Sequence, residues 1–416
     1  MSSTICAIIP TYNRSAMLGE CIDSILAQSR PVEEIFVVND GSTDNTLAVI
    51  QSYGDRVTLL NKKNGGKSSA LNLALNHCKS DYVWICDDDD LAAPDGLKYL
   101  ADALDANADV DFAFGTYQVV RNDNDNGTVV YSEVTKLGLE YEPNIGLRFL
   151  EEMFTYQYAS LARRSLYERV GPFREDLVRA QDYDMAIRAS RSFKGMHVPK
   201  VIFYQRDHHG VRGTASDIIS LEGLVRRQFC YDQKIFSWVK QDFHIREFTP
   251  TFALKWEQAL ANRAALLERA CVFAAHAMWD DALDDFHQAG QASIIPAKHE
   301  ELRLPERIIK DENAWRTLFE NPVWCTKFRI CYKSNEYCRK TLRAALRAAC
   351  RPHVRRIRQF VAAGRFYEGT TVIKALFRTL GMRGALLVTF DVMLQAAPKY
   401  LLNIRLVKWA GRLRGS

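Results

Sequence analysis

Short, mainly apolar segments alternate with polar, glycine-containing loops through the first 90 residues of the chain. The segments that have the length of buried strands are residues 5–9, 34–38, 56–60 and 82–86. Between the first two, residues 15–28 place apolar side chains at helical spacing. Continuous apolar runs suit strands that are covered on both faces of a sheet. Strands that alternate with helices in this way predict a mostly parallel α/β sheet with right-handed crossovers.

The loops that follow these segments are polar, and in an open α/β sheet such loops form the ligand-binding edge. Asp40 can accept an N–H from a nucleobase, and the backbone near Gly41 can approach a ligand closely because glycine has no side chain. The same loop can be a plain turn in which Ser42 or Thr43 caps the next helix. The first loop lacks G-x-G-x-x-G, which argues against a dinucleotide-binding dehydrogenase.

The third and fourth loops carry opposite charges. Lys67 follows Gly65 and Gly66 at the start of a helix, where a cation is well placed for phosphate. Four consecutive aspartates, residues 87–90, follow the fourth segment and repel one another unless a positive group lies among them. A divalent cation bound to a diphosphate is a natural partner for such a run, and a solvated acidic turn is the alternative.

These motifs occur in a characteristic order and spacing. IIPTYNR, VVNDGSTDNT, NGGKSSALNLAL and YVWICDDDD are followed by the segment ARRSLYERVGPFREDLVRAQDYDMAIRAS. Over residues 4–215 the chain resembles the GT-A-fold, family-2 inverting glycosyltransferases of the bacterial surface-polysaccharide type. The resemblance implies a Rossmann-like α/β catalytic domain with a mostly parallel sheet, and a hexosyl- or N-acetylhexosaminyltransferase.

The resemblance also implies which residues bind the donor, a nucleotide sugar that is most often UDP-linked. Asp40 would hydrogen-bond the base, Asp87 would contact the ribose or the metal shell, and Asp88 holds the variable middle position of the DxD motif. The donor-binding positions are Pro10, Thr11, Asn13, Asp40, Gly41, Lys67, Asp87, Asp88 and Arg206.

The metal ligands and the catalytic base are implied in the same way. Asp89 would bind Mn²⁺ or Mg²⁺ directly, and His208, in an Arg-x-His segment, would complete the metal or diphosphate site, with His209 as the alternative. Asp182 falls where this family has its base, although the alternative of a helix N-cap exists. The family usually has an acid before that aspartate, and here the residue is Gln181.

The rest of the chain reads as helical and carries no catalytic motif. Helical spacing covers residues 221–240, and two helices between residues 251 and 292 resemble one tetratricopeptide-like pair, which is weak evidence for a repeat array. We expect a catalytic domain at residues 1–220, a helical, partly acidic domain at 221–326 and a basic helical tail at 327–416.

The net charge of +5 conceals a strong asymmetry. Residues 327–416 carry 20 Lys and Arg against three acids, or +17, whereas the preceding 326 residues carry 35 against 47, or −12. Arginine recurs every four residues, the spacing of one helix face, at Arg339, Arg343, Arg347, Arg351 and Arg355. Such a face suits an anionic membrane surface or the acidic part of the same chain. No nucleic-acid-reading motif accompanies it, so we expect no nucleic-acid partner.

Composition fixes the expected environment. With 47% hydrophobic and 25% charged residues, the chain has the composition of an ordinary soluble protein. The longest apolar run, residues 385–397, is short and contains Asp391, so no transmembrane helix is expected. The amino terminus lacks the features of a signal peptide, and ten cysteines without paired spacing fit a reducing cytosol. The absence of C-x-x-C argues against a zinc site among Cys325, Cys331, Cys338 and Cys350.

We therefore expect a cytoplasmic enzyme, peripheral on the inner face of the cytoplasmic membrane. It would extend a lipid-linked or surface-polysaccharide glycan, and the basic tail motivates the lipid-linked acceptor. The alternatives are a non-catalytic nucleotide-sugar-binding module, which retention of Asp89 and Asp182 disfavours, and a scaffold recruited to the membrane.

Overall fold

The computed structural model describes residues 3–122, 129–207, 221–310 and 312–348. The chain forms two compact units, Met1–Ile235 and Phe236–Ser416. Their boundary lies within helix α8 (Leu221–Asp242). The expected division at residues 220 and 326 stays a prediction, and its second boundary falls inside helix α13 (Pro322–Ser334).

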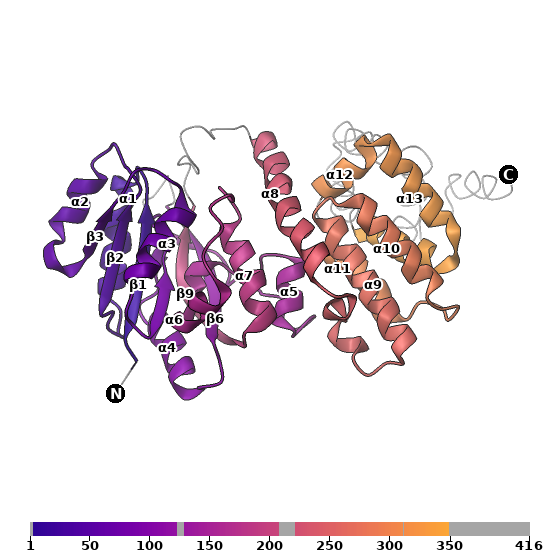
Figure 1. Ribbon diagram of the computed structural model, residues 1–416, viewed down its shortest axis with the longest axis horizontal. Helices are drawn as coiled ribbons and strands as arrows, with labels where there is room; N and C mark the ends of the chain where they lie inside the picture. Colours follow the sequence, from indigo (N-terminus) through magenta and orange to yellow (C-terminus); the bar gives the residue numbers. More distant parts are fainter. Residues whose placement is uncertain (1–2, 123–128, 208–220, 311, 349–416) are drawn as a thin grey trace, which may run out of the picture. The chain divides into compact units, whose positions relative to one another are not determined.

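A mixed sheet lies at the centre of the first unit (Figure 1). The four strands predicted from the sequence are parallel neighbours in the order β3 (Thr58–Asn61), β2 (Glu34–Asn39), β1 (Ile5–Thr11) and β4 (Tyr82–Ile85). The order continues with β8 (Ser160–Arg163), β6 (Phe112–Asn122), β9 (Gly195–Arg206) and β5 (Leu91–Ala92), and β7 (Val129–Tyr131) pairs with β6. β6 and β9 are parallel, whereas β8 is antiparallel to both its neighbours. The predicted α/β fold class is confirmed.

Helices cover both faces of this sheet. They are α1 (Ser15–Leu26), α2 (Thr46–Ser52), α3 (Lys67–His77), α4 (Gly96–Ala106), α5 (Ile145–Glu151), α6 (Arg164–Val170) and α7 (Gln181–Ser192), with 3-10 turns at Gly54–Arg56 and Gln157–Ala159. Alternate residues of the fully buried β1 enter two separate cores. Ile5 and Ile9 pack with α1 and α4, whereas Cys6 and Ile8 pack with α3. Burial on both faces explains why β1 is a continuous apolar run.

The cap expected for the second helix is wrong in detail. α2 begins at Thr46, and the carboxylate of Asp44, not the hydroxyl of Ser42 or Thr43, accepts a hydrogen bond from the Thr46 amide at 3.0 Å. Asp44 also accepts one from the Thr46 hydroxyl. Ser42 is therefore available for a contact between loops.

The described part of the second unit is helical. Its elements are the end of α8, α9 (Gln258–Ala275), α10 (Trp279–Gln291), α11 (His299–Ile308), α12 (Glu312–Glu320), α13 and residues 336–348, with 3-10 turns at Ile245–Phe248 and Thr251–Ala253. α9 packs against α10 (Figure 1). Within this core the guanidinium of Arg263 bonds both oxygens of Glu301, at 2.8 and 2.6 Å, and both side chains are fully buried.

Membrane-spanning segments were expected to be absent. Among the described residues, no helix combines the length and apolar character that crossing a bilayer requires. Residues 385–397, the longest apolar run, lie outside the described residues.

Candidate active site

A cavity of about 590 Å³ opens in the first unit where β1, β2 and β4 end. This volume lies within the roughly 300–1,000 Å³ that is usual for small-molecule sites. Its walls come from the polar loops predicted to form the ligand-binding edge, and from the start of α7. The lining residues are Pro10, Thr11, Tyr12, Arg14, Asp40, Asn64, Gly66, Lys67, Ala70, Asp87, Asp88, Asp89, Asp90, Met153, Tyr156, Val178, Arg179, Ala180, Gln181, Asp182, Tyr183 and Gln205.

Most of the site residues predicted from the sequence meet in this cavity. Those on its wall are Pro10, Thr11, Asp40, Lys67, Asp87, Asp88, Asp89 and Asp182. Asn13, Gly41 and Arg206 belong to the described residues but do not line it. His208 and its alternative His209 lie outside the described residues.

The carboxylates of the acidic turn are only partly neutralised by neighbouring cations. Lys67 forms a salt bridge with Asp87, and Nη2 of Arg14 lies 3.5 Å from Oδ2 of Asp89. Between them, Oδ2 of Asp88 is buried without a hydrogen-bond partner. Burial, followed by the charge of Asp89, raises the pKa of Asp88 to about 7. Four carboxyl groups therefore crowd one turn of the cavity wall, where burial and the charge of Asp89 disfavour ionisation of Asp88.

A divalent cation fits this turn. Mg²⁺ is usually held by one or two carboxylates together with substrate phosphates, and Mn²⁺ also accepts oxygen ligands. The carboxylates of Asp87 and Asp89 line the cavity, and the unpaired oxygen of Asp88 is a further ligand of this type. The residues present thus agree with the Mn²⁺ or Mg²⁺ that the resemblance implies.

Arg206 holds the main chain of the acidic turn, and its expected contact with the donor stays a prediction. Its Nε donates to the main-chain oxygen of Asp89 at 2.6 Å, and its main-chain N–H donates to Oδ1 of Asp90 at 2.9 Å. Its remaining nitrogens bond the carboxylate of Glu20 and the main-chain oxygen of Met17. Arg206 is a positioning residue in this structure.

Asp40 is engaged by the protein itself. Its Oδ1 accepts hydrogen bonds from Nζ of Lys62 at 2.6 Å and from the Gly65 amide at 2.9 Å, and its Oδ2 accepts one from the Gly66 amide at 2.8 Å. Asp40 as a whole residue is 4% exposed. Asp40 therefore fixes the glycine turn that leads into α3. The predicted hydrogen bond from a nucleobase would have to use the remaining lone pairs of this carboxylate.

Gly41 and Asn13 join neighbouring loops. Gly41 has φ +78°, and a Cβ there would lie 2.7 Å from the Asn64 nitrogen, so only glycine allows this approach. This close contact is made with the protein backbone, and the expected approach of the loop to a ligand stays a prediction. The Asn13 amide donates to Oγ of Ser42 at 2.9 Å, and Oδ1 of Asn13 accepts from the Thr43 amide at 2.8 Å.

Asp182 faces the cavity from the first turn of α7. It is the second residue of that helix, and Ala180, with φ +59°, holds the N-cap position, so the N-cap interpretation of Asp182 is wrong. Burial raises the pKa of Asp182, the charge of Lys67 opposes this shift, and the charge of Asp87 adds to it. A carboxylate with a raised pKa is a stronger base, which suits proton abstraction.

The structure adds residues that the sequence analysis did not assign to the site. Arg14, Tyr156, Arg179 and Gln205 line the same cavity. Arg14 directly follows the predicted PTYN positions, so its place in this loop could have identified it as a site residue. Gln181 was noticed only as a departure from the family, yet it is 7% exposed and its side-chain oxygen is buried without a hydrogen-bond partner.

Residues 6–171 match the family described as Glycosyl transferase family 2. This match lies within the first unit and covers less than half of the chain. A chondroitin synthase of Pasteurella multocida (strain Pm70) is 32% identical over 210 residues, covering 49% of this chain and 20% of that protein. A protein of Rickettsia typhi described as an uncharacterized glycosyltransferase is 32% identical over 204 residues, covering 49% of this chain and 61% of that protein. This chain therefore spans less than two thirds of the length of these relatives.

Solved structures with similar folds share little sequence with this chain. Residues 1–349 of S. aureus TarS, in complex with UDP-GlcNAc, give a TM-score of 0.49 at 18% identity, covering 82% of this chain and 90% of that one. The mannosyltransferase PcManGT of Pyrobaculum calidifontis, in complex with GDP-Man and Mn²⁺, gives 0.46 at 18% identity, covering 83% and 88%.

Proposed function

We propose that the first unit transfers a glycosyl group from a nucleoside-diphosphate sugar to a hydroxyl group of a glycan, with inversion at the anomeric carbon. The observation that carries this proposal is the meeting of Asp182, Lys67 and the acidic turn on one cavity wall. These groups are close enough for the charges of Asp87 and Asp182 both to act on Lys67. This arrangement supports Asp182 as the base and Lys67 as the cation for the leaving group.

In the proposed reaction, the acceptor oxygen forms a bond to the anomeric carbon while the bond from that carbon to the diphosphate oxygen breaks. Asp182 takes the hydroxyl proton, and the electron pair of the broken bond stays with the departing nucleoside diphosphate. A positioned general base contributes roughly 10²–10⁴ in rate. The raised pKa of Asp182 favours this role.

Lys67 would stabilise the negative charge that grows on the diphosphate. Asp89 would hold Mn²⁺ or Mg²⁺, with Asp87 and Asp88 beside it and His208 as the further ligand expected from the sequence. When bound, such an ion supplies Lewis-acid neutralisation of the diphosphate charge. Arg206 keeps the main chain of the turn in place for these contacts.

The donor and the acceptor are proposed from the sequence and from the relatives. We propose a UDP-linked donor on the resemblance in the sequence, and a lipid-linked or surface polysaccharide as acceptor. Relatives with 32% identity over 210 residues are named for the polysaccharides chondroitin and hyaluronan, which supports a glycan acceptor. We also propose that the enzyme works at the inner face of the cytoplasmic membrane, through its basic tail.

The experiment is calorimetric titration of UDP in Mn²⁺ or in EDTA, together with UDP release from a panel of UDP-sugars. We expect UDP binding to need the metal, and Asp89→Ala to remove both this dependence and turnover while leaving the fold intact. Undiminished binding in EDTA with an active Asp89→Ala enzyme would contradict the metal assignment. A correctly folded protein that binds no nucleoside diphosphate, with or without metal, would contradict the proposed function.

A further inference from the structure

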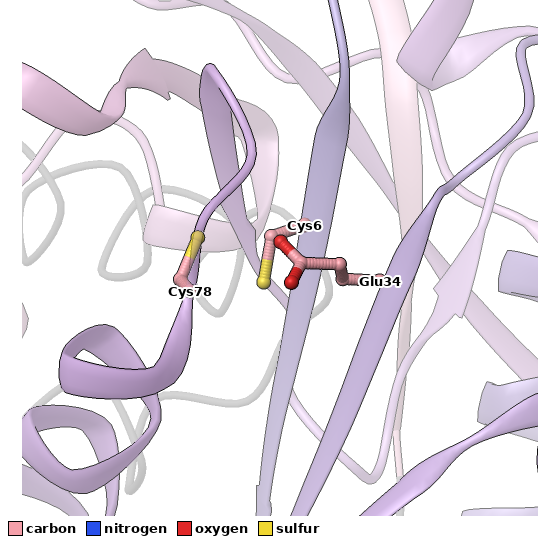
Figure 2. Close-up of side chains that lie close together, drawn as sticks. All are labelled: Cys6, Glu34 and Cys78. Atoms are coloured by element: carbon pink, nitrogen blue, oxygen red, sulfur yellow. The ribbon is translucent and has the colours of Figure 1, made fainter.

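Three side chains with metal-ligating atoms lie close together (Figure 2). They lie where β1 and β2 begin, whereas the cavity lies where these strands end. They are Cys6 of β1, Glu34 at the start of β2 and Cys78 at the end of α3. One ligand atom from each lies within 4.8 Å of the other two. The residues are 28 and 44 positions apart along the chain, so only the fold brings them together.

The sheet register explains the meeting. Cys6 is paired with Glu34 between the parallel strands β1 and β2, which places both side chains on the same face of the sheet. α3 covers that face, and Cys78 is its C-terminal cap residue. Cys6 is fully buried and Cys78 is 6% exposed, whereas Glu34 is only half-buried and leaves a path from solvent.

The carboxylate of Glu34 is already oriented by the polypeptide. Its Oε2 accepts hydrogen bonds from the Lys79 amide at 3.0 Å, the Ser80 amide at 2.8 Å and the Ser80 hydroxyl at 2.5 Å. Such outer contacts are typical of carboxylates that bind metals. Burial opposes the shift, but these hydrogen bonds lower the pKa of Glu34.

The ligand types indicate the metal. Two thiolates and a carboxylate suit Zn²⁺, whereas Mg²⁺ and Mn²⁺ prefer sites made of oxygen alone. Tetrahedral zinc with Zn–S bonds of about 2.3 Å would place two sulfurs about 3.8 Å apart, which this cluster can accommodate. Cys6 and Cys78 are free cysteines in the structure, so both sulfurs can serve as ligands.

We propose that Cys6, Glu34 and Cys78 form a structural zinc site, with water in the fourth position. The site joins β1, β2 and the turn between α3 and β4. Because β4 carries the acidic turn at its other end, the ion stabilises the strand on which the active site is built. This site is independent of the glycosyltransferase proposal, since it shares no residue with the cavity.

Cobalt is a suitable probe, because Co²⁺ bound to thiolate gives a sulfur-to-metal charge-transfer absorption that oxygen ligands do not give. The full-length, reduced, metal-free protein would be titrated with Co²⁺ in excess Mg²⁺, which competes for sites made of oxygen ligands. We expect one equivalent to give this absorption and Zn²⁺ to abolish it by displacement. Cys6→Ala and Cys78→Ser should lose it, and Glu34→Gln should weaken Co²⁺ binding at least about tenfold.

Cys271→Ser is the matched control, because Cys271 is fully buried but belongs to the second unit. It should retain the absorption. Zn²⁺ should also raise the Tm of the wild-type protein and of this control, but not that of Cys78→Ser. If the cysteine variants fail to fold, Glu34→Gln decides, because glutamine can still accept the hydrogen bonds of the turn. Absence of the absorption in the folded, reduced wild type would overturn the proposal, as would its persistence in Cys78→Ser.

Discussion

The ammonium group of Lys67 forms a salt bridge with the carboxylate of Asp87 on the wall of the cavity. Burial alone would lower the pKa of this lysine, but the charges of Asp87 and Asp182 raise it above its usual value. Lys67 therefore stays charged and links the acidic turn electrostatically to Asp182. In the proposed reaction, one cation serves both the leaving group and the ionised form of Asp182.

Lys67→Met keeps the length of the side chain and removes its charge. We expect kcat/KM to fall by about 10²–10³, the usual effect of removing one group that stabilises transition-state charge. Because Lys67 lowers the pKa of Asp182, its loss should also raise that pKa. Asp182 must be ionised to act as the base. As the pH is lowered, the variant should therefore lose activity at a higher pH than the wild-type enzyme does. A pH profile of kcat measures this shift.

The control for this change is Lys63→Met, since Lys63 is exposed in the same loop and does not line the cavity. It should leave the pH profile where it is. If the Lys67→Met enzyme is slower but loses activity at the same acidic pH as the wild type, Lys67 does not change the pKa of Asp182.

Asp182→Asn tests the base directly. Asparagine keeps the size of the side chain and its hydrogen bonding but cannot take the proton. We expect kcat to fall at least about a hundredfold, with donor affinity close to normal. Asp176→Asn is the control, because Asp176 is exposed, pairs with Arg174 and lies outside the cavity. Loss of donor binding together with turnover in Asp182→Asn would indicate a structural role.

Gln181 precedes Asp182 at the position where the family usually has an acidic residue. Its side-chain oxygen is buried and unpaired on the cavity wall. Gln181→Glu would add a like charge beside Asp182, so the pKa of the base should rise and the acid limb of kcat should move to higher pH. Gln181→Met, which adds no charge, should leave the limb in place. Equal limbs in the two variants would contradict this electrostatic account.

Arg206 allows a test of whether the position of the acidic turn matters, because its side chain holds that turn. Arg206→Ala removes the donors to Asp89 and Met17, so we expect metal-dependent UDP binding to weaken about tenfold or more. Arg121→Ala removes an exposed pair with Asp207 at the same end of the sheet and should change little. Calorimetry in Mn²⁺ compares the two. Similar affinities for both variants would mean that the turn holds its shape without Arg206.

The first four strands could be predicted because each is a local signal. β1 and β4 are buried along their whole length, so their sequences are continuous apolar runs. β9 gives no such run, because only Ile202 and Phe203 of its residues are buried. The predicted third strand began too early, since residues 54–56 form a 3-10 turn before β3.

The same limit applies to the site. The four loops were identified from the sequence, but the direction of each side chain depends on partners far along the chain. Asp40 bonds the amides of Gly65 and Gly66, 25 and 26 residues away. Arg206 reaches Asp89 across 117 residues. Such pairings arise only when the sheet forms, so a motif predicts that a residue is near the site and not which group it contacts.

The first part of the basic tail belongs to the described residues, and its structure shows where a truncation should be made. Residues 336–348 are helical, as the four-residue spacing of arginine predicted. On this helix Arg339 is exposed, whereas Arg343 and Arg347 are half-buried and Leu342 and Leu346 are buried. This part of the tail therefore belongs to the core of the second unit. A truncation should follow residue 348, since one at 326 would remove buried side chains.

Membrane binding of the tail is the last prediction. Residues 349–416 carry 13 Lys and Arg against two acids, a net charge of +11, and each basic residue near an anionic surface contributes about 1 kcal/mol. The full chain should sediment with phosphatidylglycerol-containing vesicles and much less with phosphatidylcholine alone, whereas residues 1–348 should not sediment and should still bind UDP. Salt weakens docking onto acidic protein as well as membrane binding, so lipid composition is the variable to change.

Single charge reversals distinguish a membrane face from a packing face. Arg339→Glu adds repulsion at an exposed position, so it should reduce sedimentation about tenfold without lowering the Tm. Arg347→Glu changes a half-buried position and should lower the Tm. If Arg339→Glu and the truncated chain sediment like the full chain, the basic residues are not what holds the protein on anionic lipid. The excess charge would then be left to interactions within the chain or with other proteins.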